Sequence, residues 1–279
     1  SAASDVYKRQ LFLLLSLPAL ALGIWAQFKV RSAFSKNAEI KTSTGMTGSQ
    51  VARRILDING LNDVQVEQVN GFLSDHYDPR HRVLRLSPDV YAGNSLSAAG
   101  VAAHEAGHAL QHKDGYAMLK VRSAMVPAVQ IGSWLGPLIF LAGFFMAGMI
   151  GTSLAWLGFL LFAAVAAFAL VTLPVEFDAS NRAKRLLVSQ NILFPQEIGG
   201  ASAVLNAAAL TYVAAAVHAA LAPYDHVFDV RRRHSDGRRC VHFPDVSDGV
   251  FQVGAVVDVT NQRDQAHAAP VEGDSADTC

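Results

Sequence analysis

Charged residues are scarce in this chain. Asp, Glu, Lys and Arg make up 16% of its 279 residues, against about 25% in an average soluble domain. Hydrophobic residues make up 51%, and their concentration in particular segments predicts a membrane protein in contact with the lipid bilayer. The 23 basic and 23 acidic residues cancel, so no overall field attracts a nucleic acid, and no nucleic-acid-binding module is recognisable.

Cysteine is almost absent too. The chain has only Cys240 and Cys279, both in its C-terminal part. Two cysteines placed there imply neither a disulfide framework nor a cysteine-based zinc site.

What the sequence has instead is apolar segments near the length that crosses a bilayer, about 20 residues. We expect a mainly α membrane protein with about four transmembrane helices and a small α+β region. The expected spans are residues 11–27, 125–150, 153–173 and 201–222. The middle two are joined by Gly151-Thr152 and predict a membrane hairpin over residues 124–173.

The first and last of these segments are the weaker candidates. The first is short and contains Pro18, and the last is rich in alanine and carries polar residues such as Asn206 and His218. A buried or interfacial helix is the alternative for each. The first segment also resembles a signal peptide, but it has no convincing small-x-small cleavage site before Lys29, which favours an uncleaved anchor.

Residues 28–123, between the first two spans, form the expected soluble α+β region. A capping box from Thr47 to Gln50 predicts the start of a helix that ends near Gly60. Residues 64–69 then alternate between apolar and polar, as in a half-buried strand.

A hairpin is expected next. Residues 72–76 and 82–86 flank an Asp-Pro turn signal at 78–79. Three basic side chains are expected on wet faces of this hairpin: His81, Arg82 and Arg85.

The most informative motif is HEAGH, His104 to His108. Two histidines four residues apart on a helix face the same way, so both imidazoles can bind one metal ion. Glu105 lies beside that face, where a carboxylate can take a proton from a metal-bound water. This is the H-E-x-x-H pattern of zinc metallopeptidases. The alternative is a helix whose two histidines only satisfy nearby polar groups.

The motif is expected in the middle of a helix over residues 97–111. This stretch contains no proline. Three preceding or initial residues are candidate caps for it: Asn94, Ser95 and Ser97. The order of helix, strands and helix is seen in many zincins. There the active-site helix packs under a sheet whose edge strand can hold an extended peptide. Residues 28–123 are therefore expected to be a small α+β, zincin-like catalytic region.

His112 continues the four-residue spacing of the histidines. At 1.5 Å per residue it lies about 12 Å from His104 along the helix axis, too far for both to bind one ion. We therefore expect His112 at the surface or behind the ligands. The extended metzincin pattern is excluded, because Asp114 stands where its third histidine would be.

A catalytic zinc site normally has three protein ligands and a water. The best candidates for the third ligand follow the third apolar segment, in a helix expected over residues 174–200. Glu176 and Asp178 compete there on spacing alone. A carboxylate stabilised by the helix dipole is the alternative role for Glu176.

The membrane hairpin provides an independent check on this site. A hairpin returns the chain to the side from which it entered, so the segments before residue 124 and after residue 173 lie on one side of the membrane. His104, His108 and Glu176 can therefore meet. One or three crossings between them would keep them apart.

Several separated stretches resemble the YugP-type neutral zinc metallopeptidases of bacterial membranes. In order along residues 11–222 they read LSDHYDP, VLRLSPDVY, GVAAHEAGHALQH, RSAMVP, TLPVEFDAS and VLNAAALTYVAAA. The resemblance implies a membrane-bound zinc peptidase, with His104 and His108 as zinc ligands and Glu105 as the catalytic base.

Similarity to the HtpX-type membrane proteases implies that Glu176 is the third ligand. Those enzymes have an aspartate where this chain has Ser180. The role of that aspartate behind the ligands is therefore expected to pass to Asp178 or Ser180.

The two ends depart from the family pattern. Residues 1–10 lack an initiator methionine and are expected to be a non-native leader. After the fourth span, residues 223–279 begin with a basic run and continue as a polar, acidic stretch. They are expected to be an artefactual or disordered tail, and no function is assigned to the histidines and cysteines in it.

Basic residues flank the membrane segments on the side of the HEAGH region. They are Lys29, Arg31, Lys36, Lys41, Lys113, Lys120, Arg122, Arg182, Lys184 and Arg185. The positive-inside rule then predicts a multi-pass protein of the bacterial inner membrane, with its catalytic region in the cytoplasm.

The functional hypothesis is zinc-dependent hydrolysis of protein or peptide substrates, membrane proteins included, with Glu105 as general base. An oxyanion donor besides zinc is sought among Tyr212, Asn181 and Arg182. A non-catalytic zinc-binding scaffold or chaperone-like partner is the alternative, although it has no need of Glu105. An intramembrane protease is a third reading, disfavoured by the charged residues directly after the motif.

Overall fold

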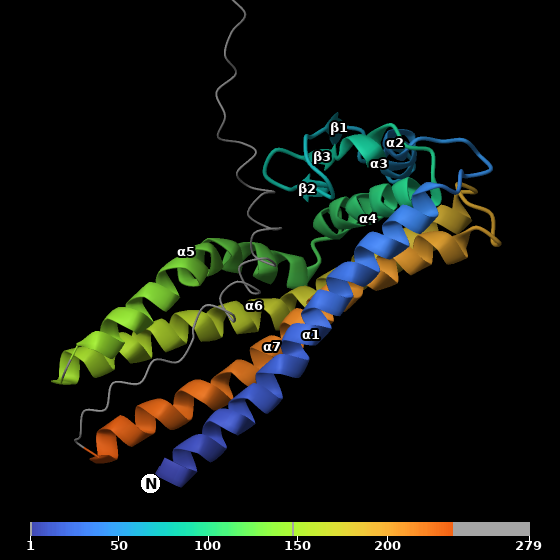
Figure 1. The fold of residues 1–279 in the computed structure, drawn as a ribbon. Helices are drawn as coiled ribbons and strands as arrows, with labels where there is room; N and C mark the ends of the chain where they lie inside the picture. The colour runs from blue at the N-terminus through green and yellow to red at the C-terminus, as the bar shows by residue number, and fades with distance from the viewer. Residues whose placement is uncertain (1, 147, 237–279) are drawn as a thin grey trace, which may run out of the picture.

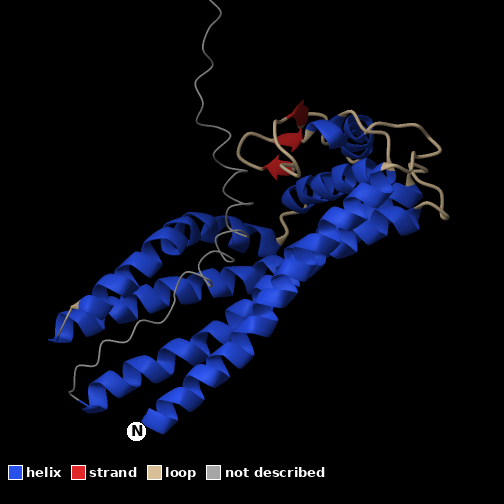
Figure 2. Cartoon of the chain, in the orientation of Figure 1, coloured by secondary structure: helices blue, strands red, loops and turns tan. Residues whose placement is uncertain are grey.

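The computed structural model describes residues 2–146 and 148–236, and this part of the chain is mainly helical (Figures 1 and 2). Two pairs of long helices form an elongated base. In one pair, α1 (Ala2–Ala38) lies beside α7 (Ile198–Asp236), and in the other α5 (Ala117–Phe145) lies beside α6 (Gly148–Ser189). The shorter helices and a small sheet cover one end of this base.

Among the described residues, three helical stretches are long and apolar enough to cross a membrane: Ala117–Gly143, Trp156–Ser189 and Ile198–Val217. They correspond to the second, third and fourth expected spans. The mainly helical class with a small sheet is confirmed. The expected crossing at residues 11–27, which belongs to α1, stays a prediction.

The hairpin of α5 and α6 reverses earlier than expected. α5 ends at Phe145 and α6 begins at Gly148, so Gly151 and Thr152 belong to the first turns of α6 and not to the connection. A side chain at Gly151 would be too close to α5, since an added Cβ would lie 1.9 Å from the carbonyl oxygen of Met146. This glycine permits a close approach where the sequence suggested a turn.

α6 is one helix throughout, with Pro174 inside it. The expected helix start near residue 174 is therefore wrong. A proline in a helix removes one backbone donor but does not have to end the helix. Glu176 consequently lies within α6 and far from its N-terminus, which excludes the role of a carboxylate stabilised at a helix start.

α6 is also longer than a membrane is thick. The 34 residues of its apolar stretch measure about 51 Å at 1.5 Å per residue, against about 30 Å for the hydrocarbon core. The charged side chains of this stretch all lie at its C-terminal end, from Glu176 onward. A helix of this length needs only part of its residues to cross a hydrocarbon core.

α7 continues past the expected end of the fourth span to Asp236. Residues 223–236 thus belong to a helix and not to a disordered tail. The rest of the expected tail, residues 237–279, lies outside the described residues, as does residue 1 of the expected leader.

The soluble region begins with α2 (Gly48–Ile58), and its predicted capping box is confirmed. Thr47 N donates to the Gln50 side chain at 3.0 Å, and Gln50 N donates to the Thr47 hydroxyl at 3.3 Å. The helix stops before Gly60, whose φ of +68° reverses the chain.

The sheet has the order β1 (Gln65–Gln68), β3 (Val83–Leu86), β2 (His76–Asp78), with β1 parallel and β2 antiparallel to the central β3. The predicted strand at 64–69 and the predicted hairpin are confirmed. The first hairpin strand starts only at His76, because Leu73 has a φ of +54° that no strand allows.

One of the expected wet-face positions in this hairpin is wrong. The side chain of Arg85 is only 14% exposed, and it pairs with Glu67 on β1 and Asp78 on β2. The guanidinium therefore joins the two outer strands across the central one.

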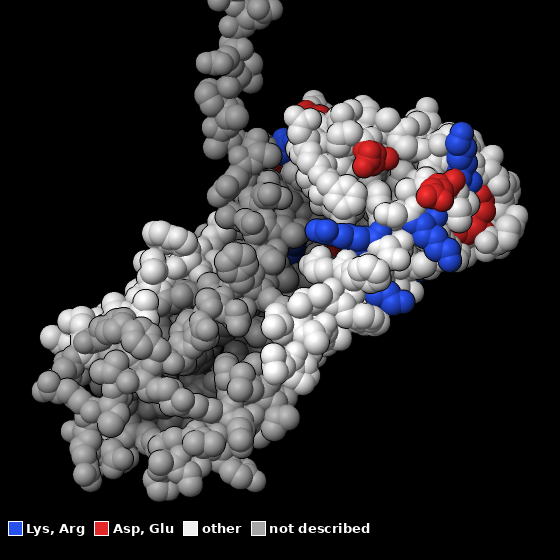
Figure 3. Space-filling model, in the orientation of Figure 1, with Lys and Arg blue, Asp and Glu red and all other residues white. Residues whose placement is uncertain are grey.

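α4 (Leu96–Lys113) carries HEAGH and lies between the sheet and the long helices (Figure 1). Ser95 is its cap and accepts a hydrogen bond from Ala98 N at 3.2 Å. The short α3 (Pro88–Tyr91) precedes it. In the face drawn in Figure 3, charged side chains gather over this end of the molecule.

Candidate metal centre

The site forms where α4 crosses α6. Gly107, inside HEAGH, touches the backbone of α6 so closely that an added Cβ would lie 2.8 Å from the carbonyl oxygen of Ala179. Ala106 on α4 and Ala179 and Ala183 on α6 are fully buried. Small residues on both helices allow the two backbones to approach, and the side chains on either side of the crossing then meet.

His104, His108 and Glu176 come together at this crossing. Each offers one ligand atom, and these atoms all lie within 4.8 Å of one another. Glu176 Oε2 lies 3.1 Å from His104 Nε2 and 3.7 Å from His108 Nε2. Ligands bound tetrahedrally at about 2.0–2.1 Å lie about 3.3 Å apart, so one small divalent ion fits among these three groups.

The chemistry of this donor set also fits a metal. Two imidazoles and one carboxylate, with a fourth position left for water, are a ligand set that catalytic zinc uses. Within the described residues, His108 Nε2 and Glu176 Oε1 are buried and make no hydrogen bond. A buried polar atom without a partner costs about 1–3 kcal/mol, and a metal bound by His108 would offset that cost.

Asp178, the competing carboxylate, is engaged elsewhere. Its Oδ2 accepts hydrogen bonds from Gln111 Nε2 at 2.9 Å and from Arg182 Nε at 2.7 Å. The geometry therefore favours Glu176 over Asp178 as the third ligand.

Each histidine has a partner behind it. Ser180 Oγ lies 3.1 Å from His104 Nδ1, and Gln111 Oε1 lies 2.9 Å from His108 Nδ1. A partner on Nδ1 orients the ring so that Nε2 faces the ion. Either Asp178 or Ser180 was expected behind the ligands, and Ser180 is the one that contacts a histidine ligand directly. Gln111 was missed. Its position three residues after His108, on the same face of α4, is the signal that would have found it.

Arg122 was also missed as a site residue. Its Nη2 lies 3.8 Å from Glu176 Oε1, and its side chain is only 15% exposed. In the sequence, this arginine counted only as a charge flanking a membrane span. Its place at the start of α5, directly after the motif helix, is compatible with a role at the site as well.

Glu105 is buried, with 2% of its surface exposed. It lies three residues before His108, the second histidine of the motif. Its role as the base stays a prediction. Among the oxyanion candidates, Arg182 is paired with both Asp178 and Asp114, which disfavours it. Asn181 is exposed, and Tyr212 is half-buried on α7, so their roles stay predictions.

His112 lies outside the three-ligand group. Its Nδ1 is 2.9 Å from the hydroxyl of Tyr77, which joins α4 to the edge strand β2. Burial raises the pKa of Tyr77, with Arg82 opposing the rise. For Asp78, beside Tyr77, burial alone would raise the pKa, but hydrogen bonds from His81 and Arg80 lower it to about 2.

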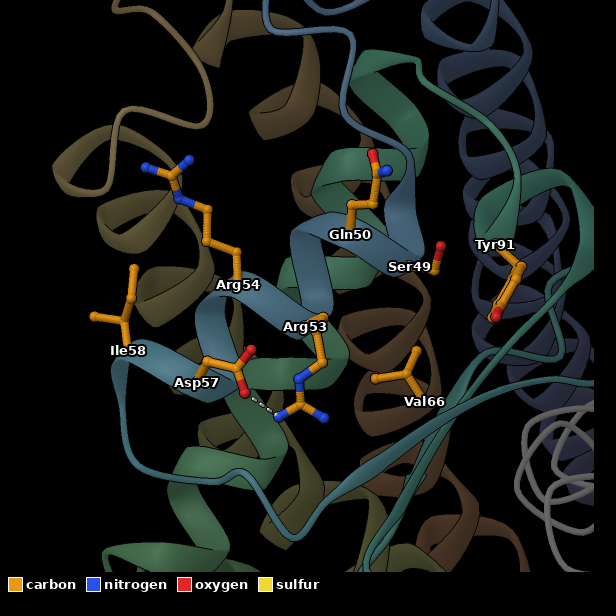
Figure 4. A pocket seen from close by; sticks show the side chains of 8 residues that line it. All are labelled: Ser49, Gln50, Arg53, Arg54, Asp57, Ile58, Val66 and Tyr91. Carbon is orange, nitrogen blue, oxygen red and sulfur yellow. Dashed lines mark ion pairs between the residues drawn. The ribbon is translucent and has the colours of Figure 1, made fainter.

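A surface cavity of about 600 Å³ lies elsewhere, over α2 (Figure 4). Arg53 and Asp57 form an ion pair on its wall. Val66 and Tyr91 approach it from β1 and α3. None of the three candidate ligands lines this cavity, so it is not the metal centre.

In the part of the chain that the structure describes, the H-E-x-x-H helix thus packs against a long apolar helix whose Glu176 lies beside both histidines. Residues 12–227 match the model of a family described as "Putative neutral zinc metallopeptidase", and the chain belongs to this family. The resemblance seen in the sequence is thereby confirmed.

One curated relative is "Putative membrane protease YugP" of Bacillus subtilis (strain 168). It is 52% identical to this chain over 207 residues, which cover 74% of the chain and 91% of the relative. No solved structure matches the chain.

Proposed function

We propose that this protein is a membrane-bound, zinc-dependent metallopeptidase that hydrolyses peptide bonds in protein or peptide substrates. The observation that carries the proposal is the convergence of ligand atoms from His104, His108 and Glu176 within 4.8 Å. Glu105 is buried on α4, the helix that carries the two histidines. Membership of the zinc metallopeptidase family supports it independently.

In the proposed reaction, His104, His108 and Glu176 hold the metal. When bound, zinc lowers the pKa of a coordinated water and polarises the scissile carbonyl. Glu105 accepts the proton of the attacking water and delivers it to the leaving amine. Ser180 and Gln111 keep the two imidazoles oriented, and Arg122 balances the charge of Glu176.

We place the site at the cytoplasmic boundary of the bacterial plasma membrane. The excess length of α6 supports a site beyond the hydrocarbon core, and the basic residues beside the spans support the cytoplasmic side. α4 is not among the stretches apolar enough to cross a membrane, which disfavours the intramembrane reading. Membrane proteins, which share this location, are substrates to test first.

The test is proteolysis by the purified full chain in detergent, with its zinc content measured in parallel. Casein and a membrane protein serve as substrates. We expect cleavage that a chelator abolishes and added zinc restores. The variant Glu105→Gln should bind zinc as the wild type does and lose cleavage by at least about 100-fold, the lower range for a general base.

Two results would contradict the proposal. Undiminished cleavage by Glu105→Gln would remove Glu105 from the reaction. Stoichiometric zinc without cleavage of any substrate would favour the alternative, a zinc-binding scaffold or chaperone-like partner.

A further inference from the structure

Gln111 is a residue of α4, and its side chain is completely buried where α4 packs against α6. Its Oε1 is 2.9 Å from His108 Nδ1, and its Nε2 donates to the carbonyl oxygen of Val175 at 2.8 Å and to Asp178 Oδ2 at 2.9 Å. Both N–H groups of this amide and one lone pair of its oxygen are therefore used inside the protein.

These contacts determine which end of the amide faces the histidine. The carbonyl of Val175 and the carboxylate of Asp178 can only accept hydrogen bonds, so both must face the NH₂ group. The oxygen of the amide then faces His108 and can only accept. A neutral imidazole carries one N–H; here it must be at Nδ1, which leaves the lone pair of Nε2 directed at the metal position.

The same amide connects two ligands. Val175 directly precedes Glu176 on α6. The hydrogen bond from Gln111 to the carbonyl oxygen of Val175 therefore connects the backbone beside Glu176 to the side chain that contacts His108. Asp178, the other acceptor, is held in turn by Arg182, which also pairs with Asp114 at the end of α4. Acceptor groups on α6 thus determine the orientation of the Gln111 amide, and its oxygen contacts His108 on α4.

We propose that Gln111 is a positioning residue of the metal centre: it selects the tautomer of His108 that binds metal and sets the distance from His108 to Glu176. This inference rests on the proposed metal site. A purely structural role, in which Gln111 only joins two helices, is the competing explanation.

Two substitutions at one position separate these roles. Gln111→Met keeps the volume of the side chain and removes every hydrogen bond. Gln111→Glu keeps an oxygen that accepts from His108 Nδ1 in either protonation state, but places an acid beside Asp178 and the Val175 carbonyl. A structural role predicts that Glu is the worse replacement, whereas a positioning role predicts that Met is.

The matched control is Ser97→Ala. Ser97 is a fully buried polar residue on the same helix, and its hydroxyl donates to the carbonyl of Phe34 at 2.7 Å, at the other end of α4 from the site. Its loss should lower the thermal midpoint of the metal-free protein without changing zinc affinity.

The measurement is zinc affinity of the full chain in detergent, by competition with a chromophoric chelator, together with the absorption spectrum of the cobalt-substituted protein. We expect Gln111→Met to bind zinc about 10- to 100-fold more weakly, the range for groups behind ligands, with an altered cobalt spectrum. Gln111→Glu should keep a zinc affinity close to that of the wild type, although its metal-free form melts earlier.

The inference is overturned if Gln111→Met binds zinc as the wild type does, or if Gln111→Glu loses as much affinity as Gln111→Met. If the Met variant does not fold, the Glu variant decides: retained affinity with a lowered midpoint supports positioning, and a joint loss overturns it. These readings need no substrate. A wild type that binds zinc and cleaves nothing would therefore defeat the peptidase proposal and leave the affinity ranking intact.

Discussion

At the scale of single residues, Glu176 illustrates how a helix separates neighbours in the sequence. Glu176 and Asp178 are two positions apart on α6, which turns them about 200° from one another around the axis. Glu176 faces the two histidines, and Asp178 faces Gln111 and Arg182. Two carboxylates of similar chemistry thereby acquire different tasks.

Replacing Glu176 should remove the metal. In Glu176→Gln a weakly coordinating amide replaces the carboxylate, and we expect zinc affinity to fall more than about 100-fold, beyond the range for groups behind the ligands. Chelator competition measures this. Glu67→Gln, on the sheet, is the control and should bind zinc normally. Equal zinc affinity in both variants would exclude Glu176 as a ligand.

At the scale of elements, the close contact of α4 and α6 holds the site together. Gly107 and Ala179 let the two backbones approach, and the ligands lie on either side of this point. The close contact is a requirement of packing, and the pattern of apolar residues along α4 does not predict it.

A methyl group at this contact should act against helix propensity. At an exposed helix position, alanine is more favourable than glycine by up to about 1 kcal/mol. Gly107→Ala should nevertheless destabilise the protein by about 1–3 kcal/mol, as overpacking does. It should also weaken zinc binding. Gly199→Ala, which meets nothing within 4 Å, should be neutral or stabilising. Thermal midpoints in detergent compare the two, and a harmless Gly107→Ala would refute the tight crossing.

The hairpin of β2 and β3 should respond to acid through Asp78. Its pKa is lowered to about 2 in the folded protein, from an ordinary 3.8. A depressed carboxyl pKa contributes stability that is complete above the ordinary value and is lost as the pH falls through the folded one. Metal-free wild type should therefore lose stability between about pH 4 and pH 2, and Asp78→Asn should lose less over that window. Parallel thermal midpoints in both proteins would contradict the role of Asp78.

At the scale of the whole molecule, the hairpin of α5 and α6 brings the ends of a long segment together. The chain leaves α4, passes along α5, and returns along α6 to place Glu176 beside the motif helix (Figure 1). A site assembled in this way requires both ends of the hairpin to lie on one side of the membrane.

Impermeant thiol labelling tests this topology. In a background without Cys240 and Cys279, single cysteines at Asp114 and Glu197 should react from the cytoplasmic side. A cysteine at Ile150, near the turn of the hairpin and 65% exposed, should react only from the other side. Right-side-out and inverted vesicles give the two readings. Labelling of all three positions from one side would disprove the membrane hairpin.

Local patterns were sufficient where neighbours in the chain decide the structure. The capping box at Thr47, the end of α2 at Gly60 and the helix around HEAGH follow from contacts within a few residues. The errors at Gly151 and Pro174 have one cause: each is a residue that often ends a helix. Here packing against α5 and the surroundings of a long apolar helix allow the helix to continue through both.

By itself, then, the sequence determined a mainly helical membrane protein with two histidines and a glutamate on one helix, because helical spacing and apolar length are local properties. Only the tertiary structure decided which carboxylate faces those histidines, that Gln111 lies behind His108, and that Arg122 lies beside Glu176. These choices depend on how α4, α5 and α6 are rotated about their axes, and that rotation is set by contacts between residues more than 60 positions apart.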